Sequence, residues 1–188
     1  FRTIQQALPG VLRPSAIPDS LRIPRSVHRL DAATSGLLLI AKTSTAAVRL
    51  GQLFERREVE KSYQAIVIGK VLGGGRFREK IHGLDAETSY ESLEIVPSRR
   101  NGHLSLLQLH PLTGRTHQLR IHLSEAGHPI MGDKIYGTPG NVYLGKGLFL
   151  CATGLTFAHP FSLENMNIEI DPPNKFRLLL EREKRNFS

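Results

Sequence analysis

The stretch HRLDAATSG occupies residues 28–36 and is followed by the apolar run Leu37–Ile40. A buried strand needs only an apolar run or an alternating pattern, so folding alone does not require a His-Arg pair with an acid beside it. Two interpretations are open. Asp31 and Thr34 either tie a polar turn to its neighbours, or Asp31 is a catalytic aspartate held by cations.

The composition favours a basic domain with an anionic partner. The length of 188 residues indicates one domain, so we expect residues 1–188 to form a single catalytic domain, and 40% of them are hydrophobic, which is enough for a core. Lys and Arg total 25 against 17 Asp and Glu, a formal charge of +8. This charge favours nucleic acid as the partner, although a basic domain with no such partner has the same charge.

Cys151 is the only cysteine, which excludes an internal disulfide and a thiolate metal cage and indicates an intracellular protein. Because it lies in an apolar run, we interpret it as an inert core thiol. No apolar run approaches the roughly 18 residues of a membrane span, so we expect no membrane association. The chain begins at Phe1 without an initiator Met, and we expect its N-terminus to be truncated.

Periodicity and turn residues predict the order of elements. In the first half we expect a short helix at 3–8 in an otherwise ordered loop, a strand at 37–41, a helix at 45–56 capped by Thr43 or Ser44, a strand at 59–69 and a turn or hinge at Gly73–Gly75. A phosphate loop at these glycines is disfavoured, because no Gly-Lys-Ser/Thr sequence follows them.

The second half alternates strands and helices irregularly. We expect a hairpin of strands 88–96 and 103–110 around Asn101-Gly102, a helix at 115–126 ended by Gly127, an irregular loop at 128–140, strands at 148–157 and 166–170, and a last helix at 175–184. The irregular order predicts an α+β domain rather than a doubly wound one.

Few types of chemistry fit the polar residues. His117, His122 and His128 are five and six residues apart, which is not the spacing that places two ligands on one helical face, so we expect no metal. No Gly-x-Ser-x-Gly elbow is present. Asp31 remains as a nucleophile or base. From the residues alone, Tyr63 is interpreted as a core aromatic and Arg120 as part of a structural ion pair.

Four segments resemble, in the same order, the RluA-like family of RNA pseudouridine synthases. They are HRLDAATSGLLLIAK, EKSYQAIVIG, LHPLTGRTHQLRIHLSEAGHPIMGDKIYG and LFLCATGLTFAHPF, and they extend from about residue 26 to near the C-terminus. The resemblance implies an α+β fold with a mixed, largely antiparallel β-sheet, flanking helices and a central cleft. It also implies conversion of specific uridines to pseudouridine in structured RNA, ribosomal or transfer, without a cofactor or metal.

The resemblance also implies roles for single residues. Asp31 matches the catalytic aspartate, Tyr63 the tyrosine that stacks on the target uracil, and Arg120 the arginine that pairs with the aspartate, with Arg115 as second candidate. Arg29 matches the residue that fills the gap left by the flipped base. Asp31 would attack the ribose, remove a sugar proton or add to the uracil ring, and these routes stay open.

The remaining predictions concern substrate contacts, the oligomeric state and the cellular location. Substrate contacts are expected from His28, Arg29, Thr34, Arg115 and Leu119, and RNA-backbone contacts from Arg56, Arg57, Arg99, Arg100 and Lys134. We expect a monomer inside the cell, with the cytoplasm as the first location and an organelle or the nucleus as alternatives. The family usually has a strand and an Asn-Lys-Pro-Ala-Gly-like turn before its aspartate, and residues 1–25 contain neither. Two alternatives are an inactive RNA-binding domain of the same fold and a metal-independent hydrolase that uses Asp31 with His28.

Overall fold

The computed structural model describes residues 4–138 and 147–187. The chain forms two compact units that alternate along the sequence. The first comprises Phe1–Leu30, Leu38–Val59 and Thr156–Asn167, and the second comprises Asp31–Leu37, Glu60–Leu155 and Ile168–Ser188. The expectation of a single catalytic domain stays a prediction.

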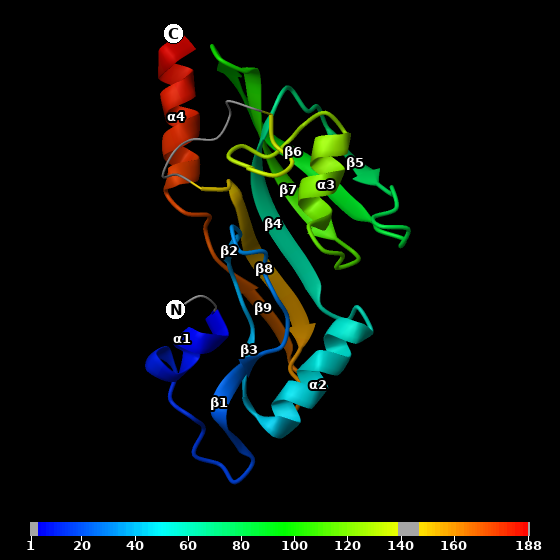
Figure 1. Cartoon of the computed structure of the whole chain (residues 1–188), viewed down its shortest axis with the longest axis vertical. Helices are drawn as coiled ribbons and strands as arrows, with labels where there is room; N and C mark the ends of the chain where they lie inside the picture. The colour runs from blue at the N-terminus through cyan, green and yellow to red at the C-terminus, as the bar shows by residue number, and fades with distance from the viewer. Residues whose placement is uncertain (1–3, 139–146, 188) are drawn as a thin grey trace. The chain divides into compact units, whose positions relative to one another are not determined.

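The first unit contains two helices and a strand pair. They are α1 (Ile4–Val11), β1 (Ser20–Ser26), β3 (Ile40–Thr43) and α2 (Ser44–Glu55). β1 and β3 pair in antiparallel fashion, and α2 directly follows β3 (Figure 1). The Thr43 hydroxyl accepts a hydrogen bond from the Ala46 backbone N–H at 3.1 Å. The predicted helix and its cap are therefore confirmed.

The second unit is built on a mixed sheet with the strand order β2-β8-β4-β7-β6-β5 and with β9 paired to β8. The strands are β2 (Ser35–Gly36), β4 (Glu60–Ile68), β5 (Gly74–Phe77), β6 (Thr88–Ser98), β7 (Gly102–Pro111), β8 (Leu150–Ala158) and β9 (Asn165–Glu169). Most of the pairs are antiparallel, whereas β2 runs parallel to β8. The α+β class and the predicted 88–96 and 103–110 hairpin are confirmed.

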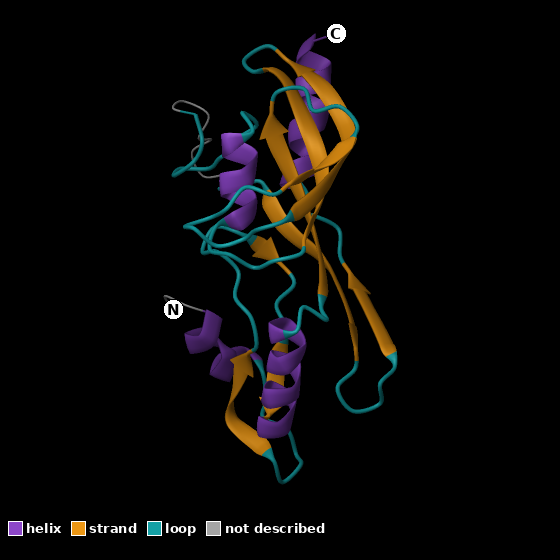
Figure 2. Cartoon of the chain, turned by 90° about the vertical axis from the view of Figure 1, so that its right-hand side faces the viewer, coloured by secondary structure: helices purple, strands orange, loops and turns teal. Residues whose placement is uncertain are grey.

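Two helices pack against this sheet, α3 (Gln118–Glu125) and α4 (Lys175–Phe187), as Figure 2 shows. Side chains of β4 alternate between its faces, so Tyr63 and Ala65 lie on one face while Gln64 and Ile66 lie on the other. The buried core combines apolar residues of β4, β7 and β8 with residues of both helices, including Leu119, Leu123, Phe176, Leu179 and Leu180. This core fixes the place of α3 on the sheet.

The predicted strand 37–41 is wrong at its start, because the chain changes sheets there. Residues 35–36 form β2 in the second unit, and regular structure resumes only at Ile40. Gly36 has φ +117° and lies directly against the Ala152 backbone of β8. A side chain at Gly36 would overlap that backbone, so only glycine permits this close parallel pairing.

Two other predictions near turns are also wrong. Gly74 and Gly75 begin β5 rather than forming a hinge, and the Tyr90 carbonyl oxygen of β6 would lie 2.8 Å from a Cβ at Gly74. The helix predicted from Arg115 begins only at Gln118, because His117 adopts a left-handed conformation with φ 57°. The end of that helix is as predicted, since Gly127 follows it with φ 81°.

Replacement of Gly36 by alanine is expected to destabilise the chain by about 3 kcal/mol or more, because it adds backbone strain to a backbone clash. The matched control is Gly51→Ala in α2, where an added Cβ meets nothing within 4 Å. Alanine favours a helix over glycine by about 0.8–1 kcal/mol, so this control should gain stability. Urea unfolding of the two variants measures both effects, and a Gly36→Ala variant as stable as the native chain would refute the account of β2.

Candidate active site

Asp31 lies in a tight turn at the start of the second unit. Its backbone carbonyl accepts a hydrogen bond from the Thr34 N–H at 2.8 Å, which closes the turn. The next two residues pair with β8, and the Ser35 hydroxyl donates to the Leu150 carbonyl at 3.3 Å. The side chain of Asp31 is 17% exposed. The turn is therefore anchored on the sheet while its carboxylate remains accessible.

Arg120 on α3 approaches this carboxylate. Its Nη1 lies 3.9 Å from Oδ2 of Asp31, and its Nε and Nη2 donate to both oxygens of Asp133 at 2.7 and 2.8 Å. The Arg120 side chain is only 6% exposed. The hydrogen bond to Asp133 raises the pKa of Arg120 against the effect of burial, helped by the charges of Asp133 and Asp31. The guanidinium is thus a fixed positive charge shared by two acids.

Asp133 balances this buried cation. Burial acts to raise the pKa of Asp133, but the hydrogen bond from Arg120, the backbone N–H groups of Tyr136 and Ile135, and the charge of Arg120 together lower it. The N–H group of Ile135 lies 2.9 Å from Oδ1 and that of Tyr136 lies 3.0 Å from it. Asp133 is therefore ionised and fully hydrogen-bonded although its side chain is 1% exposed.

His117 faces the other oxygen of Asp31. Its Nε2 lies 3.9 Å from Oδ1, and its Nδ1 shares a hydrogen bond of 2.9 Å with the hydroxyl of Tyr136. The ring of Tyr136 lies beneath the guanidinium of Arg120, with 5.1 Å between Cζ and the ring centroid. One tyrosine thus contacts both residues that approach the carboxylate.

Tyr63 on β4 lies close enough to Asp31 to respond to its charge. Burial raises its pKa to about 12, and the negative charge of Asp31 contributes in the same direction. The phenol therefore keeps its proton at neutral pH. Its side chain also packs against the core, so the ring is held in place.

The other predicted substrate contacts of the second unit have different surroundings. The Nε of Arg115, the second candidate for the partner of Asp31, donates to the Asp85 carbonyl at 3.0 Å. Leu119 is a core residue that is 7% exposed. The Thr34 hydroxyl oxygen is buried and has no hydrogen-bond partner among the described residues. Their contacts with substrate stay predictions.

His28 and Arg29 belong to the first unit. The contacts of His28 support the fold of the first unit. Its Nε2 accepts a hydrogen bond from the Leu39 N–H at 2.9 Å, and its ring stacks on Phe54. Arg29 is exposed. The RNA-backbone candidates are exposed as well: Arg56 and Arg57 after α2, Arg99 and Arg100 at the β6–β7 turn, and Lys134 beside Asp133.

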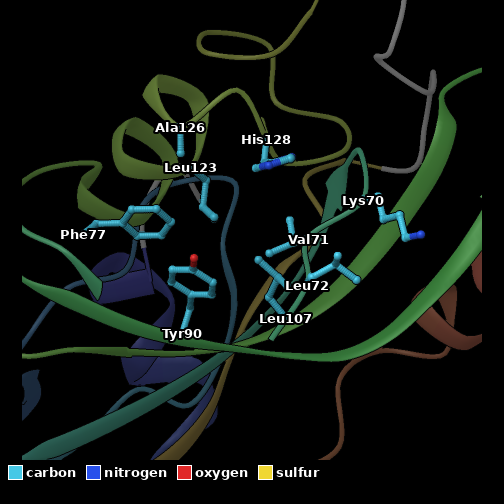
Figure 3. Close-up of a pocket in the computed structure, with 9 residues that line it drawn as sticks. All are labelled: Lys70, Val71, Leu72, Phe77, Tyr90, Leu107, Leu123, Ala126 and His128. Atoms are coloured by element: carbon cyan, nitrogen blue, oxygen red, sulfur yellow. The ribbon is translucent and has the colours of Figure 1, made fainter. Parts of the chain in front are cut away.

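Other features of the described residues do not form part of this site. A hollow of about 230 Å³ beside α3 is lined by apolar side chains together with Lys70, Tyr90 and His128, and the Tyr90 hydroxyl points into it (Figure 3). A polar hollow of about 520 Å³ lies over Gln64 and Gln108. No predicted site residue lines either hollow. His122 uses both ring nitrogens on Thr88 and the Glu79 carbonyl, which is a core role.

Within residues 4–138 and 147–187, no group of three or more His, Cys, Asp and Glu side chains could hold a metal ion. In that same part of the chain, no helix has the length and apolar character needed to cross a bilayer.

Comparison with known proteins identifies the family. A family model described as RNA pseudouridylate synthase matches residues 15–125, more than half of the chain. The chain belongs to the RNA pseudouridylate synthase family. Members of this family are isomerases that form pseudouridine in RNA, so the chain is an RNA pseudouridine synthase, as its sequence predicts.

Comparisons with individual relatives support the same family. The dual-specificity RNA pseudouridine synthase RluA of Haemophilus ducreyi is 39% identical over an alignment of 165 residues, and the match covers 77% of this chain and 72% of that protein. The ribosomal large subunit pseudouridine synthase D of Yersinia pestis is 35% identical over an alignment of 131 residues, and the match covers 64% of this chain and 40% of that protein. The structure of human RNA pseudouridylate synthase domain containing 1 superposes with a TM-score of 0.66 at 29% identity, covering 80% of this chain and 69% of that one.

Three residues of the cluster around Asp31 are absent from the sequence-based site candidates. Asp133 and Tyr136 lie in the irregular loop after α3, and His117 lies just before that helix. The signal was present in the strings GRTHQLR and GDKIYG. An acid and an aromatic residue inside an otherwise apolar or Gly-rich loop are unusual, and a buried arginine nearby requires a counter-charge.

Replacement of Asp133 by asparagine is expected to destabilise the synthase by about 3–5 kcal/mol, because it leaves a buried guanidinium with one distant acid. Asp85→Asn is the matched control, since the Asp85 side chain is 87% exposed and its carboxylate pairs with Lys80 at the surface. That control should change stability by less than about 1 kcal/mol. Urea unfolding compares the two, and equal stabilities would show that the Asp133 pair is not a structural support.

The raised pKa of Tyr63 predicts a pH dependence of stability. The folded pKa of about 12 exceeds the ordinary value of 10.0, so the neutral phenol stabilises the fold below pH 10 and this contribution is lost as the pH rises through 12. The free energy of unfolding of the native chain should therefore fall more steeply above pH 10 than that of Tyr63→Phe. Urea unfolding at a series of alkaline pH values measures both slopes, and parallel slopes would contradict the burial of this phenol.

Proposed function

We propose that this chain isomerises specific uridines of structured RNA, ribosomal or transfer, with Asp31 as the reacting group and without a metal or cofactor. One observation carries the proposal: a mostly buried carboxylate lies between Arg120 and His117, beside a phenol that keeps its proton. A relative named for the ribosomal large subunit supports ribosomal RNA as substrate, and a relative named for dual specificity supports more than one RNA substrate.

The reaction conserves all atoms of the nucleoside. The bond between C1′ of the ribose and N1 of uracil breaks, the base turns, and C5 bonds to C1′. N1 gains a proton and C5 loses one. Water at the site would divert the opened intermediate to hydrolysis, so a mostly buried carboxylate is suited to the task. Asp31 is accessible for attack on C1′, removal of a C2′ proton or addition to the ring, and all three routes use its carboxylate.

Arg120 and Tyr63 assist Asp31 in different ways. Arg120 is held by Asp133, so its guanidinium can attract and orient the Asp31 carboxylate without moving. Tyr63 offers a flat face to the uracil, and stacking of a base on an aromatic ring contributes about 1–3 kcal/mol. Its retained proton is available to a carbonyl oxygen or a ring nitrogen of the turning base.

RNA contacts extend beyond this centre. Base flipping costs a few kcal/mol, and Arg29 offsets part of that cost in our proposal by occupying the vacated space. The formal charge of +8 and the exposed Arg56, Arg57, Arg99, Arg100 and Lys134 favour binding to the RNA backbone. We further propose that the chain acts as a monomer inside the cell, where its RNA substrates are found.

Asp31→Asn is expected to reduce pseudouridine formation by at least about a thousand-fold, because the amide is neither a nucleophile nor a base. Asp85→Asn, at an exposed site outside the centre, should keep the native activity. Mass spectrometry of nucleosides from ribosomal and transfer RNA incubated with each protein measures the product. RNA that contains 5-fluorouridine, which permits early steps and blocks completion, provides a second readout of rearranged or trapped product.

Loss in Asp31→Asn alone would establish the reacting group. If Asp31→Asn and the native chain are equally active, another residue reacts. If all proteins bind both RNA classes with steep salt dependence and none forms product, the chain is the inactive RNA-binding domain instead.

A further inference from the structure

We propose that His117 is a positioning residue for Asp31. Its imidazole, held by Tyr136, faces Oδ1 of the carboxylate while Arg120 faces Oδ2, so each oxygen has its own partner at 3.9 Å. This inference rests on the proposed function of Asp31. It assigns to His117 the orientation of the carboxylate, a role different from the charge that Arg120 supplies.

The backbone of His117 is strained in a way that helix formation does not explain. Its φ of 57° is in the left-handed region, which costs a residue with a Cβ about 1–3 kcal/mol. It is the N-cap of α3, yet its side chain makes no capping hydrogen bond. Serine, threonine, asparagine or aspartate would cap this helix better. The imidazole is instead directed at Asp31 and Tyr136, which gives the strain a functional reason.

Tyr136 is well placed to hold the imidazole because the residue is fixed at three points. Its N–H donates to Asp133 at 3.0 Å, its carbonyl accepts from the Ser124 hydroxyl at 2.7 Å, and its ring meets His117 edge-on with 5.5 Å between centroids. When its hydroxyl donates to Nδ1, the proton of the neutral imidazole is on Nε2, the nitrogen that faces Asp31.

Two partners on different oxygens limit rotation of the carboxylate. A single partner such as Arg120 would leave Asp31 free to turn about its last bond and present either oxygen to the substrate. Fixing the orientation before substrate binds lowers the entropic cost of reaching the transition state. The His117 side chain is 26% exposed, so this arrangement leaves room for an RNA substrate beside it.

The test uses His117→Gly, because glycine adopts the left-handed conformation freely. The variant therefore removes the imidazole and preserves the backbone conformation at residue 117. With RNA that the native chain modifies, kcat should fall by about 10–100-fold while KM and RNA affinity change by less than about two-fold. Added imidazole should restore part of kcat. Tyr136→Phe, which removes only the hydroxyl, should lower kcat less.

The matched control is His82→Gly. His82 also has a left-handed backbone, with φ 51°, but it is exposed in the turn between Ile81 and Leu84. Both glycine variants should melt at or above the native temperature, and only His117→Gly should lose activity. The inference is overturned if His117→Gly keeps the native kcat, or if its kcat, stability and RNA affinity fall together. If the native chain and Asp31→Asn both form no product, the proposed function itself fails, a result distinct from either of these.

Discussion

The buried ion pair between Arg120 and Asp133 is the constraint on which the site depends. Both side chains lie in a low-dielectric interior where each charge alone would be costly. Two backbone N–H groups complete the hydrogen bonding of Asp133, so the pair is satisfied although it is out of water. An apolar pair of equal volume would serve stability as well. It would not place a cation 3.9 Å from Asp31, which is the reason to expect an arginine here.

The sheet positions Tyr63, the second group that the proposed site requires. β4 pairs with β7 over six residues, which fixes Tyr63 opposite Leu109. Burial keeps the phenol neutral, and the nearby carboxylate disfavours its ionisation further. The negative charge of Asp31 and the burial of the ring therefore act in the same direction to keep Tyr63 protonated at neutral pH.

Much of the fold could be predicted from the sequence because its signals are local. The helix at Ser44–Glu55 has its own cap and apolar face, and the hairpin of β6 and β7 has an Asn-Gly turn. Two of the incorrect boundaries lie at Gly36 and His117, where the backbone has a positive φ and the residue contacts segments distant in sequence. No local pattern predicts that Ala152 will pack on residue 36. The approach of Arg120 to Asp31 followed from the family resemblance alone, whereas Asp133 and Tyr136 lie in a loop without periodicity, whose path depends on the folded core.

The groups around Asp31 come from four separate segments: the turn at residue 31, β4, the start of α3 and the loop around Tyr136. A site of this kind exists only when the second unit is folded, so stability and activity are coupled through Asp133. His117 is different, because its backbone conformation costs stability while its imidazole adds orientation. Around this one carboxylate, Asp133 stabilises the fold, whereas His117 lowers its stability and orients the carboxylate. This contrast distinguishes a structural role from a positioning role. Removing the Asp133 carboxylate destabilises the fold, whereas replacing His117 by glycine relieves backbone strain.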